Sequence, residues 1–184
     1  MKRWICLLLA SVVLCGCNAD SVMDRALGFR SRFQEGACSF KATVSADYGD
    51  LIHTFVMDCK ADANMRVDFT VTAPDTISGI SGWITGDEGF LTFDREILAI
   101  SPLAEGRLSP VAAPWILINT LRGGYLRYAA ETDNGYRLTM NDSYDDGAMQ
   151  VDVRLDGEGI PLGAEILWQG RRILTVSVED FLFL

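Results

Sequence analysis

The chain has 184 residues, of which 25 are acidic and 16 basic, so its formal net charge at pH 7 is −9. With 49% hydrophobic and 22% charged residues, it has the composition of an ordinary globular protein rather than a disordered one. The acidic balance argues against nucleic-acid binding, which needs a basic surface to neutralise phosphates. The single histidine, His53, excludes a multi-histidine metal site and most histidine-based catalysis.

The first residues have the pattern of a lipoprotein leader. Two basic residues at positions 2–3 precede an apolar run over residues 4–14, which is shorter than the roughly 20 residues that a membrane-spanning helix needs. Such a run is typical of a secretory signal peptide. The letters LCGC at residues 14–17 resemble the lipobox of bacterial lipoproteins, so we expect Cys17 to carry diacylglycerol and a palmitate-type acyl chain. A plain signal peptide, with Cys17 unmodified, is the alternative.

This leader divides the chain into three parts. We expect residues 1–16 to be a signal peptide, residues 17–24 a lipid-anchored tether, and residues 25–184 a single β domain, because no repeat or linker divides the remainder. Two or three acyl chains anchor a protein stably where one does not. The predicted location is therefore the extracytoplasmic face of the cell membrane.

Two further cysteines, Cys38 and Cys59, fall in a predicted β-hairpin. Residues 38–47 and 51–59 alternate between apolar and polar side chains, and a two-residue turn at residues 48–49 would place Cys38 opposite Cys59. The Cα separation of such a pair suits a disulfide. In an exported protein we therefore expect a disulfide here, with two free buried thiols or a redox pair as alternatives.

The rest of the chain is mostly typical of strands. Helices are expected over residues 20–34 and 114–121. Alternation and short apolar runs predict strands over residues 38–47, 51–59, 65–73, 90–94, 97–101, 125–132, 136–144, 149–156, 163–168 and 172–178. The predicted fold is mainly β (α+β): a curled antiparallel sheet, or incomplete β-barrel, of about ten strands partly covered by two or three helices.

One turn signal is strong enough to predict a register. The dipeptide Asp146-Gly147 is typical of a two-residue type I′ hairpin turn. With that turn, Met140 lies opposite Val153 on the apolar face of the hairpin.

No sequence pattern indicates catalysis or metal binding. The nucleophile-elbow and phosphate-loop motifs are absent, and the polar residues over 141–152 do not have the spacing of an EF-hand calcium loop. We therefore expect a protein that is not an enzyme and has no cofactor and no metal. A polar hairpin end explains residues 141–152 more simply than calcium does, and an acidic active site without a motif is the weakest alternative.

In order and pattern, the chain resembles the LolA/LolB superfamily, and more narrowly the single-domain LolA-like lipoproteins of Gram-positive bacteria. The features that carry the resemblance are the lipobox, an N-terminal helix, paired long strands, the segment Pro74–Gly82 and a mid-chain helix. The resemblance covers nearly all of residues 20–184. It implies an incomplete barrel around an apolar cavity closed by helices. A tethered protein departs from the soluble carriers of that superfamily, which have no anchor.

The resemblance implies non-catalytic binding of a lipid, an acyl chain or a lipoprotein segment in an apolar concavity. Aromatic and methionine side chains adapt to apolar ligands. The candidates to line the concavity are Phe40, Phe55, Met57, Phe69, Trp83, Phe93, Trp115 and Met140. The alternative is a structural or protein-interaction lipoprotein of the cell envelope, with a fully packed core and an envelope protein as its partner.

Overall fold

The computed structural model describes residues 18–86, 88–100, 103–104, 107–144 and 147–184. The predicted signal peptide and the lipidation residue Cys17 lie outside these ranges. Among the described helices, none is long and apolar enough to cross a membrane.

The strands of the main sheet pair antiparallel with one another. They follow the order β6-β5-β4-β3-β2-β1-β13-β12-β11-β10-β9, so β6 and β9 are the edges and the sheet does not close into a barrel. The strands are β1 (Cys38–Asp47), β2 (Ile52–Ala61), β3 (Val67–Ala73), β4 (Ser81–Ile84), β5 (Gly89–Phe93), β6 (Glu96–Ile100), β9 (Tyr125–Thr132), β10 (Gly135–Asn141), β11 (Gln150–Leu155), β12 (Pro161–Trp168) and β13 (Arg171–Phe183). A separate short hairpin joins β7 (Leu103–Ala104) to β8 (Arg107–Leu108).

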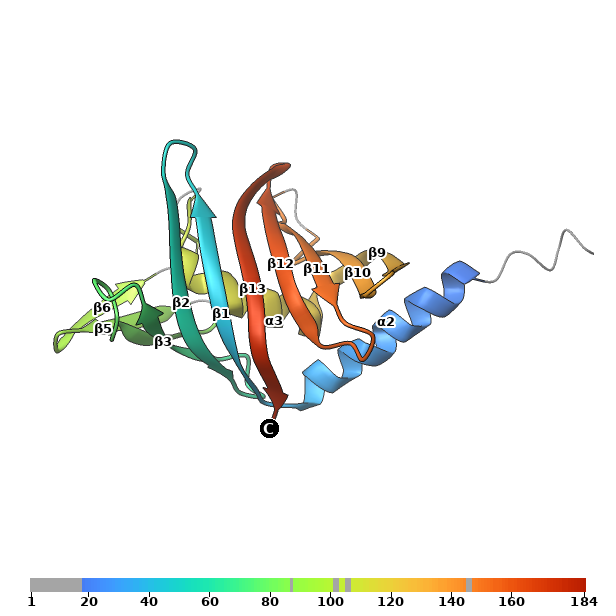
Figure 1. The fold of residues 1–184 in the computed structure, drawn as a ribbon, viewed down its shortest axis with the longest axis horizontal. Helices are drawn as coiled ribbons and strands as arrows, with labels where there is room; N and C mark the ends of the chain where they lie inside the picture. Colours follow the sequence, from blue (N-terminus) through green and yellow to red (C-terminus); the bar gives the residue numbers. More distant parts are fainter. Residues whose placement is uncertain (1–17, 87, 101–102, 105–106, 145–146) are drawn as a thin grey trace, which may run out of the picture.

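The first and last strands meet in the middle of this sheet. Strand β1 pairs with β13 along most of its length, for example Val44 opposite Val176. This pairing joins two series of hairpin-connected strands, β1–β6 on one side and β9–β13 on the other (Figure 1). The predicted open, curled antiparallel sheet with few helices is therefore confirmed.

Helix α2 (Asn18–Glu35) confirms the N-terminal helix of the sequence analysis. Its buried side chains, Ala26 and Phe33, are spaced seven residues apart and lie on one face, with the half-buried Phe29 between them. The helix packs against β9 at one edge of the sheet and against the second helix. In Figure 1 it runs along the end of the sheet opposite β5 and β6.

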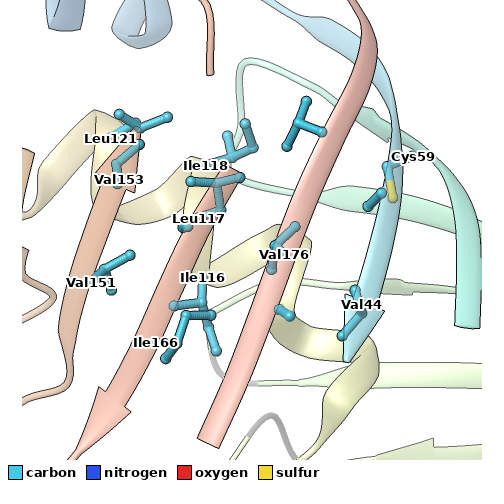
Figure 2. Close-up of a cluster of buried hydrophobic side chains, with 14 of the residues drawn as sticks. Val44, Cys59, Ile116, Leu117, Ile118, Leu121, Val151, Val153, Ile166 and Val176 are labelled. Carbon is cyan, nitrogen blue, oxygen red and sulfur yellow. The ribbon is translucent and has the colours of Figure 1, made fainter. Parts of the chain in front are cut away.

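Helix α3 (Ala113–Gly123) follows the short 3-10 helix η1 (Pro110–Ala112) and crosses one face of the sheet. Most of its side chains are buried, because it lies between the two halves of the sheet and contacts β2, β13 and β11. We call the face covered by the helices the inner face and the opposite one the outer face. Figure 2 shows side chains of α3 directed into this layer: Ile116, Leu117, Ile118 and Leu121 lie among Val44, Val151, Val153, Ile166 and Val176 of the strands.

Two predicted registers are wrong, each by two residues. In the first hairpin Phe40 pairs with Cys59 and Asp47 with Ile52, because the loop holds four residues, 48–51, instead of two. In the β10–β11 hairpin Met140 pairs with Val151, because residues 142–149 form a long connection. Residue Asp146 of the expected turn lies outside the described residues.

Candidate functional site

A row of directly paired residues crosses the inner face from the covered centre to the β6 edge. Its members are Phe40, Cys59, Phe69, Gly82, Leu91 and Leu98. Phe40, Cys59 and Phe69 are 3–4% exposed, whereas Leu98 is 59% exposed. The row therefore begins in the hydrophobic core and ends in solvent.

The exposed end of this row, together with the neighbouring Phe93, forms an apolar patch. We call this patch, which consists of Leu91, Phe93 and Leu98, the inner patch. Leu91 is half-buried against the core. Phe93 is two residues further along the same strand and therefore lies on the same face. Phe93 and Leu98 are exposed, since β5 and β6 extend beyond the part of the sheet that α3 contacts (Figure 1). Contiguous exposed apolar side chains of this kind mark interaction or ligand sites.

Five of the eight expected ligand residues belong to the buried core. Phe40, Phe55, Met57, Phe69 and Met140 are at most 6% exposed. The structure therefore brings these five into one layer beneath the helices, where they pack against protein.

The other three do not line one common site. Trp83 was expected in the concavity, but it lies on the outer face, because its neighbour Ile84 is fully buried on the inner one. There the Arg66 guanidinium lies 4.7 Å from the centre of the indole ring. Trp115, at the start of α3, donates its Nε1 hydrogen bond to the Met65 carbonyl at 2.8 Å. Only Phe93 lies on the inner patch.

The interface between α2 and the sheet is tightly packed. Its cavity has a volume of about 10 Å³ and is lined by side chains that include Phe29, Phe33, Leu138 and Met140. This volume is less than one acyl chain requires, because each methylene group alone occupies a volume of that order or more. An apolar ligand therefore does not fit between α2 and these strands as they are packed here.

The expected disulfide is not formed: Cys38 and Cys59 are free and buried. The register explains this, because Cys38 pairs with Ala61 and Cys59 with Phe40. Burial raises the pKa of the Cys38 thiol to about 11, although the nearby Arg122 charge and a hydrogen bond at Ala61 act in the opposite direction. Burial, with smaller effects of Asp58 and Cys38, also raises the pKa of Cys59. Both groups are therefore protonated and poorly nucleophilic at neutral pH.

The sequence analysis missed a buried carboxylate on the outer face. Asp152 accepts hydrogen bonds from Arg137 at 2.8 Å and from the Gln150 amide at 3.0 Å, and its side chain is 11% exposed. Burial opposes the charged form, but the bonds from Arg137, Thr139 and Gln150 outweigh it and lower the pKa of Asp152. The sequence did not mark Asp152 as buried, because polar residues are routine at the outward positions of an alternating strand.

The described residues were also compared with the ligand sets that metal ions need. Within the described ranges, no group of three or more His, Cys, Asp or Glu side chains is placed to hold a metal ion.

Several solved structures are similar to this chain in fold. No family model matches the chain, and no curated protein matches it. An uncharacterised conserved protein from Thermus thermophilus is 12% identical over 88% of this chain and 87% of its own, with a TM-score of 0.49. A LolA superfamily protein from Nitrosomonas europaea is 9% identical over 85% and 92%, with a TM-score of 0.47. The lipoprotein LppX of Mycobacterium tuberculosis is 12% identical over 88% and 93%, with a TM-score of 0.43.

These likenesses concern the fold alone, because the identities are 9–12% and the TM-scores lie below 0.5. The narrower Gram-positive type stays a prediction.

Proposed function

We propose that this chain is a non-catalytic lipoprotein of the cell envelope that binds a lipid acyl chain or an apolar lipoprotein segment. In this proposal residues 1–16 are removed, Cys17 carries the anchor, residues 17–24 form the tether, and residues 25–184 form the binding domain. The ligand lies on the inner patch, against Leu91, Phe93 and Leu98.

The observation that carries the proposal is the change in exposure along the inner-face row. A strand face that only stabilised the fold would be covered by a helix or would become polar where the cover ends. Here the row itself stays apolar as exposure rises from 3% at Phe69 to 59% at Leu98, and the exposed Glu96, opposite Phe93 on the same face, borders the patch. Covering such surface contributes about 25 cal/mol for each Å² removed from water, before ordering costs are subtracted.

The location of the patch also suits an elongated apolar ligand. Because Phe69, Leu91 and Leu98 come from three different strands, their row runs across the strand direction towards the start of α3. An acyl chain lying along the row would touch side chains from each strand and enter the molecule at the end of the helix-covered layer. This arrangement uses an open surface and needs no enclosed cavity beneath α2.

The second candidate function is binding of an envelope protein, and the edge strand β6 favours it. Strand β6 pairs with β5 alone among the described strands, and Ile97 and Leu98 are exposed on its two faces. An unprotected edge of this kind can accept an extended segment of another chain.

A binding experiment with two neighbouring variants tests the first candidate. Full-length chain carrying Cys17→Ser, which cannot be acylated at that residue, is titrated with a fluorescent long-chain fatty acid. Leu98→Asp is expected to weaken binding at least tenfold, whereas Ile97→Asp, on the same strand but the outer face, stays within about twofold. Equal weakening by both variants, or no uptake by the parent chain, would contradict the inner patch as the site. Native mass spectra before and after organic extraction identify any lipid that copurifies.

A further inference from the structure

A polar cleft of about 310 Å³ lies over strands β9–β12 on the outer face, separate from the inner patch. Its polar lining consists of Arg127, Thr139, Asn141, Gln150 and Gln169. The outer position follows from alternation, since the neighbouring Leu138, Met140 and Val151 are buried on the inner face. Figure 1 shows β9–β12 side by side at the end of the sheet opposite β5 and β6.

Three of these side chains have hydrogen-bonding capacity to offer a ligand. Among the described residues, Arg127, Asn141 and Gln169 make no side-chain hydrogen bond, and Arg127 makes no ion pair. Arg127 is also the one charged side chain among those that line the cleft in the described ranges. The cleft therefore presents a single cation beside several amide groups.

The other two polar lining residues are held in place by a neighbouring carboxylate on the same face. The Gln150 amide nitrogen donates to Asp152 at 3.0 Å, so the Gln150 carbonyl oxygen remains an available acceptor. Thr139 is also hydrogen-bonded to Asp152, which is fixed in turn by Arg137 at 2.8 Å. Side chains that are already ordered lose less entropy when a ligand binds. The buried carboxylate thus serves to position two walls of the cleft.

We propose that this cleft binds a phosphate-bearing polyol, either as the headgroup of a phospholipid or as a free polyol phosphate. A planar guanidinium such as that of Arg127 matches two phosphate oxygens, while amide groups donate to and accept from hydroxyls. The volume is at the lower end of the range for small-molecule sites and suits a short polyol with one phosphate. The site is independent of the apolar inner patch, because the two lie on opposite faces and at opposite ends of the sheet.

Isothermal titration calorimetry with four probes tests the proposal. Full-length chain carrying Cys17→Ser is titrated with glycerol 1-phosphate, glycerol, inorganic phosphate, and dihexanoyl phosphatidylglycerol below its micelle concentration. Glycerol 1-phosphate is expected to bind at least tenfold more tightly than glycerol or inorganic phosphate, since it engages both the guanidinium and the amides. Tighter binding of the short-chain lipid than of glycerol 1-phosphate assigns the cleft to a lipid headgroup when the gain persists in Leu98→Asp, whose inner patch is disrupted. Equal binding of the two probes assigns the cleft to the free polyol phosphate.

Two arginine variants locate the binding. Arg127→Gln is expected to weaken glycerol 1-phosphate binding at least tenfold, with the thermal midpoint nearly unchanged because Arg127 is exposed. Arg154→Gln is the matched control: it removes an exposed outer-face arginine of β11 that does not line the cleft. Equal affinity for glycerol 1-phosphate and inorganic phosphate, binding unaffected by Arg127→Gln, or equal loss in both variants would overturn the proposal.

Discussion

Arg122 at the end of α3 donates its Nε hydrogen bond to the carbonyl of Phe33 in the last turn of α2, at 2.8 Å. Its Nη2 donates to the Gly36 carbonyl at the same distance. In return, Arg30 and Gln34 of α2 each donate to the Arg122 carbonyl at 3.0 Å. The C-terminal ends of the two helices therefore satisfy one another's carbonyls, which would otherwise lack partners, and each places a cation near the other's negative dipole end.

This reciprocal arrangement predicts that Arg122→Ala lowers the free energy of unfolding by about 2–4 kcal/mol, since one buried and one partly buried carbonyl lose their donor. Arg30→Ala is the control, because it removes a single bond from a more exposed donor, and it should cost about 1 kcal/mol or less. Urea unfolding of both variants measures the difference. Equal costs would mean that the Arg122 guanidinium does not hold the helices together.

The Asp152 network predicts a pH-dependent cost for Asp152→Asn. Because the pKa of Asp152 is lowered in the folded state, its charge contributes stability above its unfolded value near 3.9, and this contribution is lost as pH falls through the folded value. The variant is therefore expected to lose about 1–2 kcal/mol at pH 7 and much less at pH 3. Unfolding midpoints at the two pH values test this, and a cost that does not change with pH would count against the assigned charge.

The buried thiols predict slow alkylation. Iodoacetamide at pH 8 should leave Cys38 and Cys59 unmodified in the folded protein and modify both after unfolding, because the thiolate forms are rare and covered. Since their pKa values are raised on folding, the thiols contribute stability below the unfolded value near 8.5, and this is lost as pH rises towards about 11. Intact mass after mild denaturation is the readout. A mass two daltons below the reduced value would instead reveal a disulfide.

Sequence patterns predicted the faces of the strands better than their partners. Alternation placed Phe40 and Met57 on the apolar face of their hairpin, which is the buried face, although they were expected to line a concavity; the partner of Phe40 is Cys59. A shift of two residues leaves every side chain on the same face, so the hydrophobic pattern cannot detect it, and only the loop length decides it. The β1–β13 pairing was equally invisible, because the two strands are separated by most of the chain and share no local signal.

The candidate sites could not be predicted from the sequence either, because they depend on which strands pair. Leu91 and Leu98 become neighbours of Phe69 only through the pairings of β3–β6, and the glycine-rich run before Trp83 has no alternation from which its face could be inferred. The polar cleft is still harder to foresee. Arg127, Asn141, Gln150 and Gln169 are spread over four segments, and no motif links them before the strands are paired.

Two glycines provide opposite predictions, and the first of them tests the inner-face row directly. An added Cβ at Gly82 would overlap the Phe90 carbonyl oxygen and lie 3.0 Å from the Cζ atom of Phe69, so Gly82→Ala is expected to cost roughly 2 kcal/mol or more. Gly28 lies inside α2 with open space around it, so Gly28→Ala should stabilise the protein by about 0.5–1 kcal/mol.

Chemical unfolding of both variants gives the signs, and fatty-acid titration of Gly82→Ala adds a functional readout. If Phe69 must lie against Gly82 for the row to continue to Leu91, the variant should bind the probe more weakly than the parent even under conditions where it is fully folded. Gly28→Ala should bind as the parent does. Unchanged stability and binding in Gly82→Ala would show that Phe69 and Phe90 do not approach Gly82 as closely as the register requires.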